Sequence, residues 1–206
     1  MVQRRVDATA LSDAEVIAAS LDDPDLFRLI VSRHGGAVLA YSTRRVGRQD
    51  ARDVASEVFL RGFRLRHRYE GLRETCLPWL YRIARNVVGE WLKKTNRSDT
   101  IALVLDPRAA GFEDDVLDRV VAESLINELR RALELLADRD RETLLLFAVD
   151  GLTYGEIAAS LGIPPGTVGS RLTRARNDIR TQVPDLERKT NSLVGPVTEG
   201  KEEDHV

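Results

Sequence analysis

The sequence predicts an all-α fold of two small helical domains joined by a flexible acidic linker. Apolar residues recur at helical spacing along most of the chain, and no alternating, strand-like run occurs. The pattern changes after Ser98, because the stretch Asp99–Glu123 has seven acidic and two basic residues and little helical period before Asp118. We therefore expect helical domains over residues 1–98 and 120–183, a linker over 99–119 and a disordered polar tail over 184–206.

The overall composition is that of a soluble globular protein. The 206 residues are 43% hydrophobic and 31% charged. A formal net charge of −2 argues against a wholly basic nucleic-acid coat protein but leaves room for a local basic face. One cysteine, Cys76, precludes an intramolecular disulfide. Since the sequence also shows no signal peptide and no membrane-length apolar run, we expect a cytoplasmic protein without membrane insertion.

Capping residues mark the first two predicted helices. Residues 12–20 form a short amphipathic helix, in which Ser12 is the N-cap and Glu15 completes a capping box. A second helix should begin at Asp23-Pro24, because Asp caps well and Pro is favoured in the first turn. It should run to about Val46 and end at Gly47.

Two further helices, one that starts near Asp50 and one over about 77–97, complete the predicted N-terminal domain. The first of them carries an apolar stripe of Ala51, Val54, Ala55, Val58 and Gly62. Basic character is concentrated over Arg61–Arg97, which has ten Lys/Arg and three Glu.

The predicted helix over 77–97 has two distinct faces. One is an apolar stripe of Leu80, Ala84, Val87 and Trp91. Within about 60° of one another on a separate face lie Trp79, Arg82, Asn86, Lys93 and Arg97. Such groups can stack on exposed bases, bond base edges and neutralise phosphate. Taken alone, the same residues are better explained by a core tryptophan beside a solvated basic face.

The segment from Leu152 to Gln182 predicts a helix-turn-helix. Thr153 and Glu156 form a second capping box, Gly162 supplies the turn, and Pro164 and Pro165 open the second helix. The apolar stripe of that helix is Val168, Leu172, Ala175 and Ile179, and the residues broadly opposite or flanking it are Thr167, Ser170, Arg171, Arg174, Arg176 and Asn177. This hydroxyl- and arginine-bearing face suits a DNA major groove. The alternative is an αα-hairpin with a solvated arginine face.

Three segments in this order resemble the extracytoplasmic-function (ECF) group of bacterial RNA polymerase sigma factors. They are DARDVASEVFL at 50–60, WLYRIARN at 79–86 and GTVGSRLTRAR at 166–176. The resemblance covers Asp25 to about Arg97 and Asn127 to about Gln182. It implies one helical domain for each promoter element, with sigma region 2 over 1–98 and region 4 over 120–183.

The resemblance also implies site residues and partners. Asp53, Glu57 and Phe59 would dock on a coiled coil of the polymerase β′ subunit. The −10 element would be bound and opened by Tyr69, Arg73, Trp79, Arg82, Arg85, Asn86, Lys93 and Arg97. The −35 duplex would be bound by Thr167, Ser170, Arg171, Arg174 and Arg176. Expected partners are the β′ and β subunits of core polymerase, promoter DNA and an anti-sigma factor, with no cofactor and no metal.

At four positions the chain departs from the family pattern. Cys76 stands where Phe is usual, in the loop expected to capture a base, and Gly169 replaces a frequent Lys or Arg of the recognition helix. In the core-binding segment, Ser56 replaces a frequent Gln and Arg52 a frequent acid. A glycine in a helix costs about 1 kcal/mol relative to alanine, so the −35 contact is the less predictable one.

Two other classes of protein fit the sequence less well. A stand-alone helix-turn-helix regulator would bind its operator as a dimer, but dimerisation heptads and a ligand domain are not evident and the Trp79–Arg97 basic face would be unexplained. An enzyme is disfavoured, because the histidines (34, 67 and 205) are scattered and no phosphate loop or Ser/His/Asp set occurs. We therefore expect no catalytic activity.

Overall fold

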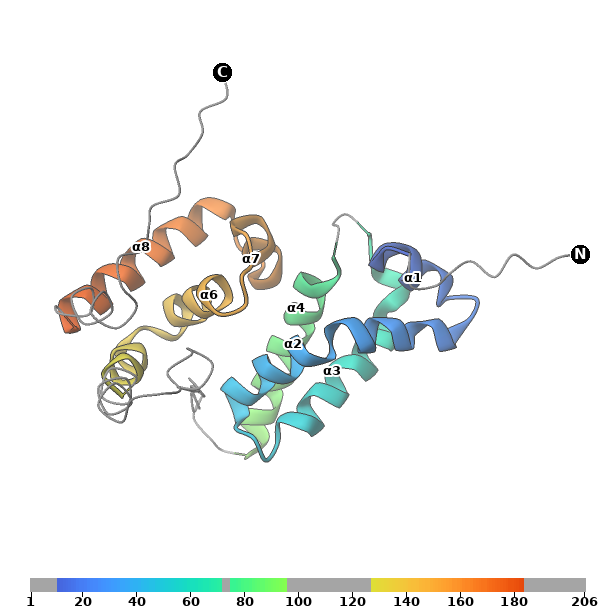
Figure 1. Ribbon diagram of the computed structural model, residues 1–206, viewed down its shortest axis with the longest axis horizontal. Coiled ribbons are helices and arrows are strands. Elements are labelled where there is room, and N and C mark those ends of the chain that lie inside the picture. Colours follow the sequence, from blue (N-terminus) through green and yellow to red (C-terminus); the bar gives the residue numbers. More distant parts are fainter. Residues whose placement is uncertain (1–10, 72–74, 96–126, 184–206) are drawn as a thin grey trace, which may run out of the picture. The chain divides into compact units, whose positions relative to one another are not determined.

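The computed structural model describes residues 11–71, 75–95 and 127–183, and all the regular structure in these ranges is helical (Figure 1). The predicted all-α fold is confirmed. Two compact units are present: of the described residues, 11–71, 75–95 and 145–169 belong to the first, and 127–144 and 170–183 to the second. The predicted linker (99–119) and tail (184–206) lie outside the described residues. None of the described helices is both long and apolar enough to cross a membrane.

The first helix, α1 (Asp13–Ala19), begins with the predicted capping box. The Glu15 backbone N–H donates to Ser12 Oγ at 3.3 Å, and the Ser12 backbone N–H donates to Glu15 Oε2 at 2.7 Å. Val16 and Ile17 are buried on the inner side of this short helix. Two unpaired backbone donors are thus satisfied where the helix starts.

The second predicted helix is divided in the structure. Pro24–Phe27 form a 3-10 helix, η1, and the α-helix α2 runs from Arg28 to Val46. The predicted helix does begin at Asp23-Pro24, but its first turn is a 3-10 helix and not an α-helix. The Asp23 side chain accepts the Asp25 N–H at 3.3 Å, and tight 3-10 turns are frequent where α-helices begin. Gly47, with φ +85°, ends α2 as predicted.

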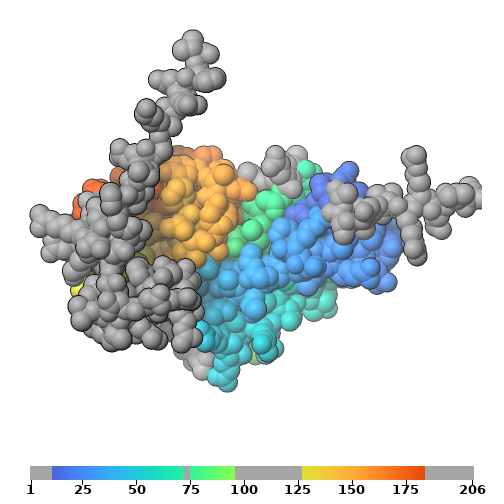
Figure 2. Space-filling model, in the orientation of Figure 1, coloured from blue at the N-terminus to red at the C-terminus, as the bar shows by residue number. Residues whose placement is uncertain are grey.

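Helices α2, α3 (Ala51–Leu65) and α4 (Leu77–Thr95) surround the core of the first unit, and a 3-10 turn, η2 (Arg66–Arg68), follows α3. Figure 2 shows α2 and α3 side by side on one face of this unit. The predicted stripe of α3 is buried throughout, and so are Leu80, Ala84 and Val87 of α4. These apolar faces determine which sides of α3 and α4 point outward.

Part of the C-terminal sequence also belongs to the first unit. Asp150 accepts two hydrogen bonds from Arg44 Nη2, at 2.6 and 2.7 Å, and one from the hydroxyl of Tyr81 at 3.0 Å. Arg44 and Tyr81 are buried, so the Asp150 carboxylate is balanced by a cation and a donor away from bulk water.

The helix-turn-helix is built as predicted, although its second helix is long. Residues 127–135 are helical and precede α6 (Asp138–Ala148), α7 (Tyr154–Leu161) and α8 (Pro165–Gln182). The capping box of Thr153 and Glu156 is present. Gly162 is left-handed, with φ +66°, and it links α7 to α8.

Candidate nucleic-acid interface

A pocket of about 480 Å³ in the first unit opens between the end of α3, the loop after η2 and the first half of α4, and Ala159 of α7 also lines it. Four predicted site residues line it: Tyr69, Trp79, Arg82 and Asn86. Sequence spacing on α4 already placed three of them on one face. Tyr69 reaches the pocket from the loop, a placement for which helical spacing gave no information.

Two aromatic rings form one wall of the pocket. The rings of Tyr69 and Trp79 lie 5.2 Å apart between centroids and are tilted by 53°. The indole of Trp79 also packs inward, since a Cβ built on Gly62 of α3 would lie 3.7 Å from its Cη2 atom. One edge of Trp79 therefore packs on α3 as a core residue would, and the residue also lines the pocket, while its stacking on a base stays a prediction.

Cationic and amide groups extend along α4 from this wall. Arg82, Arg85, Asn86 and Lys93 are exposed. Arg85 Nη1 donates to the carbonyl of Leu161 at 3.3 Å. The face therefore offers positive charge and hydrogen-bond donors beside an aromatic surface, as nucleic-acid binding requires. The predicted residues Arg73 and Arg97 lie outside the described residues.

The sequence reasoning missed Arg68, an exposed residue of η2 that lines the same pocket. Its neighbour Arg66 has a different role. The guanidinium of Arg66 lies 3.8 Å from the ring centroid of Phe63 and donates to the carbonyls of Phe63 and Ser20. Charge counting over 61–97 could not separate these two arginines, because the difference lies in their tertiary contacts.

The predicted polymerase-binding residues occupy the outer side of α3. Asp53 is exposed, while Glu57 and Phe59 are half-buried. Glu57 Oε1 accepts from Arg61 Nε at 2.7 Å. The sequence reasoning overlooked Leu60, an apolar side chain that is 43% exposed on this helix. An exposed acidic and apolar mixture of this kind is suited to a protein partner.

Arg61 also ties α3 to α4. Its Nη1 and Nη2 atoms donate to the two carboxylate oxygens of Glu90 at 2.8 and 2.7 Å. Hydrogen bonding to the Arg61 guanidinium lowers the pKa of Glu90 below its ordinary value. This bidentate pair links the helix with the predicted polymerase contacts to the helix of the aromatic pocket.

The predicted DNA-facing residues of α8 differ in how far their side chains are exposed and in the contacts they make. Ser170, Arg174 and Arg176 are exposed, whereas Thr167 and Arg171 are half-buried. The guanidinium of Arg174 pairs with the buried carboxylate of Asp140 of α6, with Nε to Oδ2 at 2.9 Å and Nη2 to Oδ1 at 3.3 Å. Arg174 therefore has a partner within its own unit, and its DNA contact stays a prediction.

Comparison with known proteins identifies the family. Residues 30–98 match the Sigma-70 region 2 family, and residues 126–179 match the Sigma-70 region 4 family. The ECF RNA polymerase sigma-E factor of Escherichia coli strain K12 is 33% identical over 175 residues, which cover 81% of this chain and 91% of that protein. The chain belongs to the ECF sigma factors. It is an alternative sigma factor that directs transcription initiation, and a stand-alone helix-turn-helix regulator is not favoured.

Two solved structures share the fold of this ECF sigma factor. CnrH in complex with the cytosolic domain of CnrY is 24% identical with a TM-score of 0.59, over 86% of this chain and 98% of that one. The sigma factor RpoE in complex with the anti-sigma factor NepR from Bartonella quintana is 21% identical with a TM-score of 0.56, over 77% and 96%. The predicted resemblance to ECF sigma factors is thus confirmed by sequence, and these two structures share the fold.

Proposed function

We propose that the pocket beside Trp79 captures an unpaired base of the −10 element during promoter opening. The observation that carries this proposal is the aromatic pair of Tyr69 and Trp79 in a pocket that Arg82 and Asn86 also line. Taking a base out of a duplex costs a few kcal/mol, which stacking and hydrogen bonding in a pocket can offset. Phosphates on either side of the base would meet the exposed cations of α4.

The remaining predicted residues divide among the other partners. Residues 1–98 would act as region 2, in which Asp53, Glu57 and Phe59 dock on the β′ subunit of core polymerase. Residues 120–183 would act as region 4 and bind the −35 duplex through Thr167, Ser170, Arg171, Arg174 and Arg176. Arg85 and Lys93, with Arg73 and Arg97, would add phosphate contacts near the −10 element. Because its partner is the transcribing polymerase, we expect the chain to act in the cytoplasm without catalytic activity of its own.

The pocket is tested by replacing Trp79 and measuring single-strand binding. Trp79→Ala should weaken binding of a fluorescent −10 non-template oligonucleotide to the reconstituted holoenzyme by about tenfold to a hundredfold, since stacking contributes about 1–3 kcal/mol per base. Affinity for core polymerase should be unchanged. The measurement is fluorescence anisotropy with each holoenzyme at one fixed salt concentration.

Trp91→Ala provides the matched control. Trp91 lies on the same helix and is half-buried, but it is not among the residues that line the pocket. If both tryptophan variants weaken oligonucleotide binding equally, the loss reflects damage to α4 and the pocket is not the base-binding site. Unchanged binding by Trp79→Ala would also refute the proposal.

We further propose an anti-sigma factor as an inhibitory partner. Two structures with this fold contain CnrH with the cytosolic domain of CnrY and RpoE with the anti-sigma factor NepR. The exposed side of α3, with Asp53 and Leu60, is the surface on which such a protein would compete with β′. If the chain binds an anti-sigma factor and core polymerase at the same time, in one complex, this proposed competition is wrong.

A further inference from the structure

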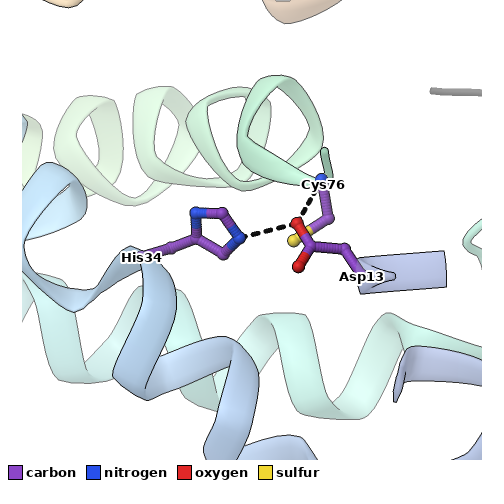
Figure 3. A group of neighbouring side chains, drawn as sticks. All are labelled: Asp13, His34 and Cys76. Atoms are coloured by element: carbon purple, nitrogen blue, oxygen red, sulfur yellow. Dashed lines mark hydrogen bonds and ion pairs between the residues drawn. The ribbon is translucent and has the colours of Figure 1, made fainter. Parts of the chain in front are cut away.

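Asp13, the first residue of α1, joins three separate parts of the first unit. Its Oδ2 atom accepts from His34 Nε2 of α2 at 2.7 Å, from the backbone N–H of Cys76 at 2.9 Å and from Thr75 Oγ1 at 3.2 Å. Its Oδ1 atom accepts from Arg33 Nη1 at 3.0 Å. Figure 3 shows Asp13, His34 and Cys76 meeting from three elements.

The carboxylate is buried, yet it is held ionised. Burial acts to raise the pKa of Asp13, but hydrogen bonds from Cys76, Arg33 and His34, together with the charge of His34, outweigh it and lower the pKa to about 2. A buried carboxylate is tolerated only when donors and opposite charge surround it. Here the compensation comes from residues far apart in the sequence, so Asp13 fixes them relative to one another.

Two of the contacts of α1 lead directly to the aromatic pocket. Thr75 lines the pocket, and its Oγ1 atom both donates to Asp13 and accepts the N–H of Leu77 at 3.2 Å in the first turn of α4. Gly71 also lines the pocket, and a Cβ added there would lie 3.3 Å from Cβ of Ala14. Helix α1 therefore touches the loop near both of its ends, on the two sides of residues 72–74, which lie outside the described residues.

We propose that α1 is a positioning element for the pocket, with Asp13 setting the place of Thr75 and of the start of α4. This inference rests on the proposed capture of a −10 base. Asp13 does not itself contact DNA: it acts through Thr75 and the Cys76 amide. The bound base would meet Thr75 and the start of α4 already held in place, so less conformational entropy is lost on binding.

The same three side chains could be taken for a zinc site, because Asp13, His34 and Cys76 offer oxygen, nitrogen and sulfur atoms within 4.8 Å of one another. The contacts favour a hydrogen-bonded cluster instead. Arg33 already pairs with the carboxylate, and burial and the nearby Asp13 charge raise the pKa of the Cys76 thiol. Zinc binds the thiolate, which these surroundings disfavour.

Asp13→Asn and Thr75→Val test the positioning role. Each should weaken holoenzyme binding to the −10 non-template oligonucleotide by about tenfold, the equivalent of one charge-assisted hydrogen bond. Each should also reduce discrimination between the preferred oligonucleotide and one changed at a single −10 base. Affinity for core polymerase should stay the same. Thr75→Val leaves the buried carboxylate in place, so it keeps the test valid if Asp13→Asn folds poorly.

Glu15→Ala is the matched control for damage to α1. It removes one half of the capping box at an exposed position, where the carboxylate accepts from Ser12. If Glu15→Ala lowers the melting temperature as much as Asp13→Asn but leaves base discrimination intact, positioning is supported over mere stabilisation of α1.

Three results would overturn the inference, and they differ in whether the proposed base-binding pocket also fails. If Asp13→Asn and Thr75→Val bind and discriminate normally while Trp79→Ala does not, α1 is only structural and the proposed pocket stands. If the Trp79→Ala holoenzyme also binds the −10 oligonucleotide normally, both the positioning role of α1 and the proposed base capture are wrong. If the full chain, purified without core polymerase, binds one zinc ion and Asp13→Asn loses it, the cluster is a metal site.

Discussion

The charge on the Asp13 carboxylate contributes to the stability of the first unit in acid. Its folded-state pKa is about 2, below the ordinary value of 3.8. A carboxyl group with a lowered pKa stabilises the fold at every pH above its unfolded value, and this contribution is lost as the pH falls through the folded value. The shift of about two pH units is equivalent to about 2 kcal/mol.

We therefore expect the free energy of unfolding to fall between about pH 4 and pH 2, partly through Asp13. In Asp13→Asn the baseline should be lower near neutral pH and the decline across this interval should be shallower. Urea unfolding followed by circular dichroism at half-unit steps of pH measures both. An equally steep decline in Asp13→Asn would show that other carboxylates produce the acid limb.

At the scale of elements, the turn of the helix-turn-helix depends on one left-handed residue. Gly162 has φ +66° and closes α7, with its N–H bonded to the carbonyl of Ala158. An L side chain in this conformation costs roughly 1–2 kcal/mol. Gly162→Ala should therefore lower the free energy of unfolding by about 1 kcal/mol and weaken duplex −35 binding.

Gly166→Ala is the control for that prediction. Gly166 lies in the first turn of α8, its φ is not left-handed, and a Cβ there would meet nothing within 4 Å. Since alanine is the better helix former, this variant should be neutral or more stable. Thermal unfolding of both variants measures the contrast, and equal melting temperatures would mean that the turn tolerates a side chain.

For the whole molecule, the sequence predicted the features that depend on residues close together in the chain. The two capping boxes and the Gly47 and Gly162 ends follow from a few neighbouring residues. The buried stripe of α3 and the buried Val168, Leu172 and Ala175 of α8 follow from helical period. Contacts between distant residues could not be predicted in this way. Thr75 and Arg68 of the pocket carried no signal of their own.

Asp13 shows the reason most clearly, because its partner Cys76 lies 63 positions along the chain and donates through its backbone. Any residue type except proline can supply a backbone donor, so the identity of residue 76 does not predict this hydrogen bond. In the sequence, only the unusual Cys76 side chain stands out. The Arg174–Asp140 pair is a similar case: helical spacing placed Arg174 on the outer face but could not supply its partner from α6.

The proposed two-site reading of the promoter makes a prediction about the DNA as a whole. Regions 2 and 4 match separate parts of one chain, so binding at one promoter element raises the effective concentration at the other. Inserting about 5 bp between the −35 and −10 elements turns them to opposite faces of the helix, since one turn is about 10 bp. Open-complex formation should then fall to the level of a promoter without a −35 element, while binding of the −10 oligonucleotide is unchanged. Permanganate footprinting on the two promoters measures the first quantity. If the insertion has no effect, the −35 element is not bound together with the −10 element, and α8 must have another ligand.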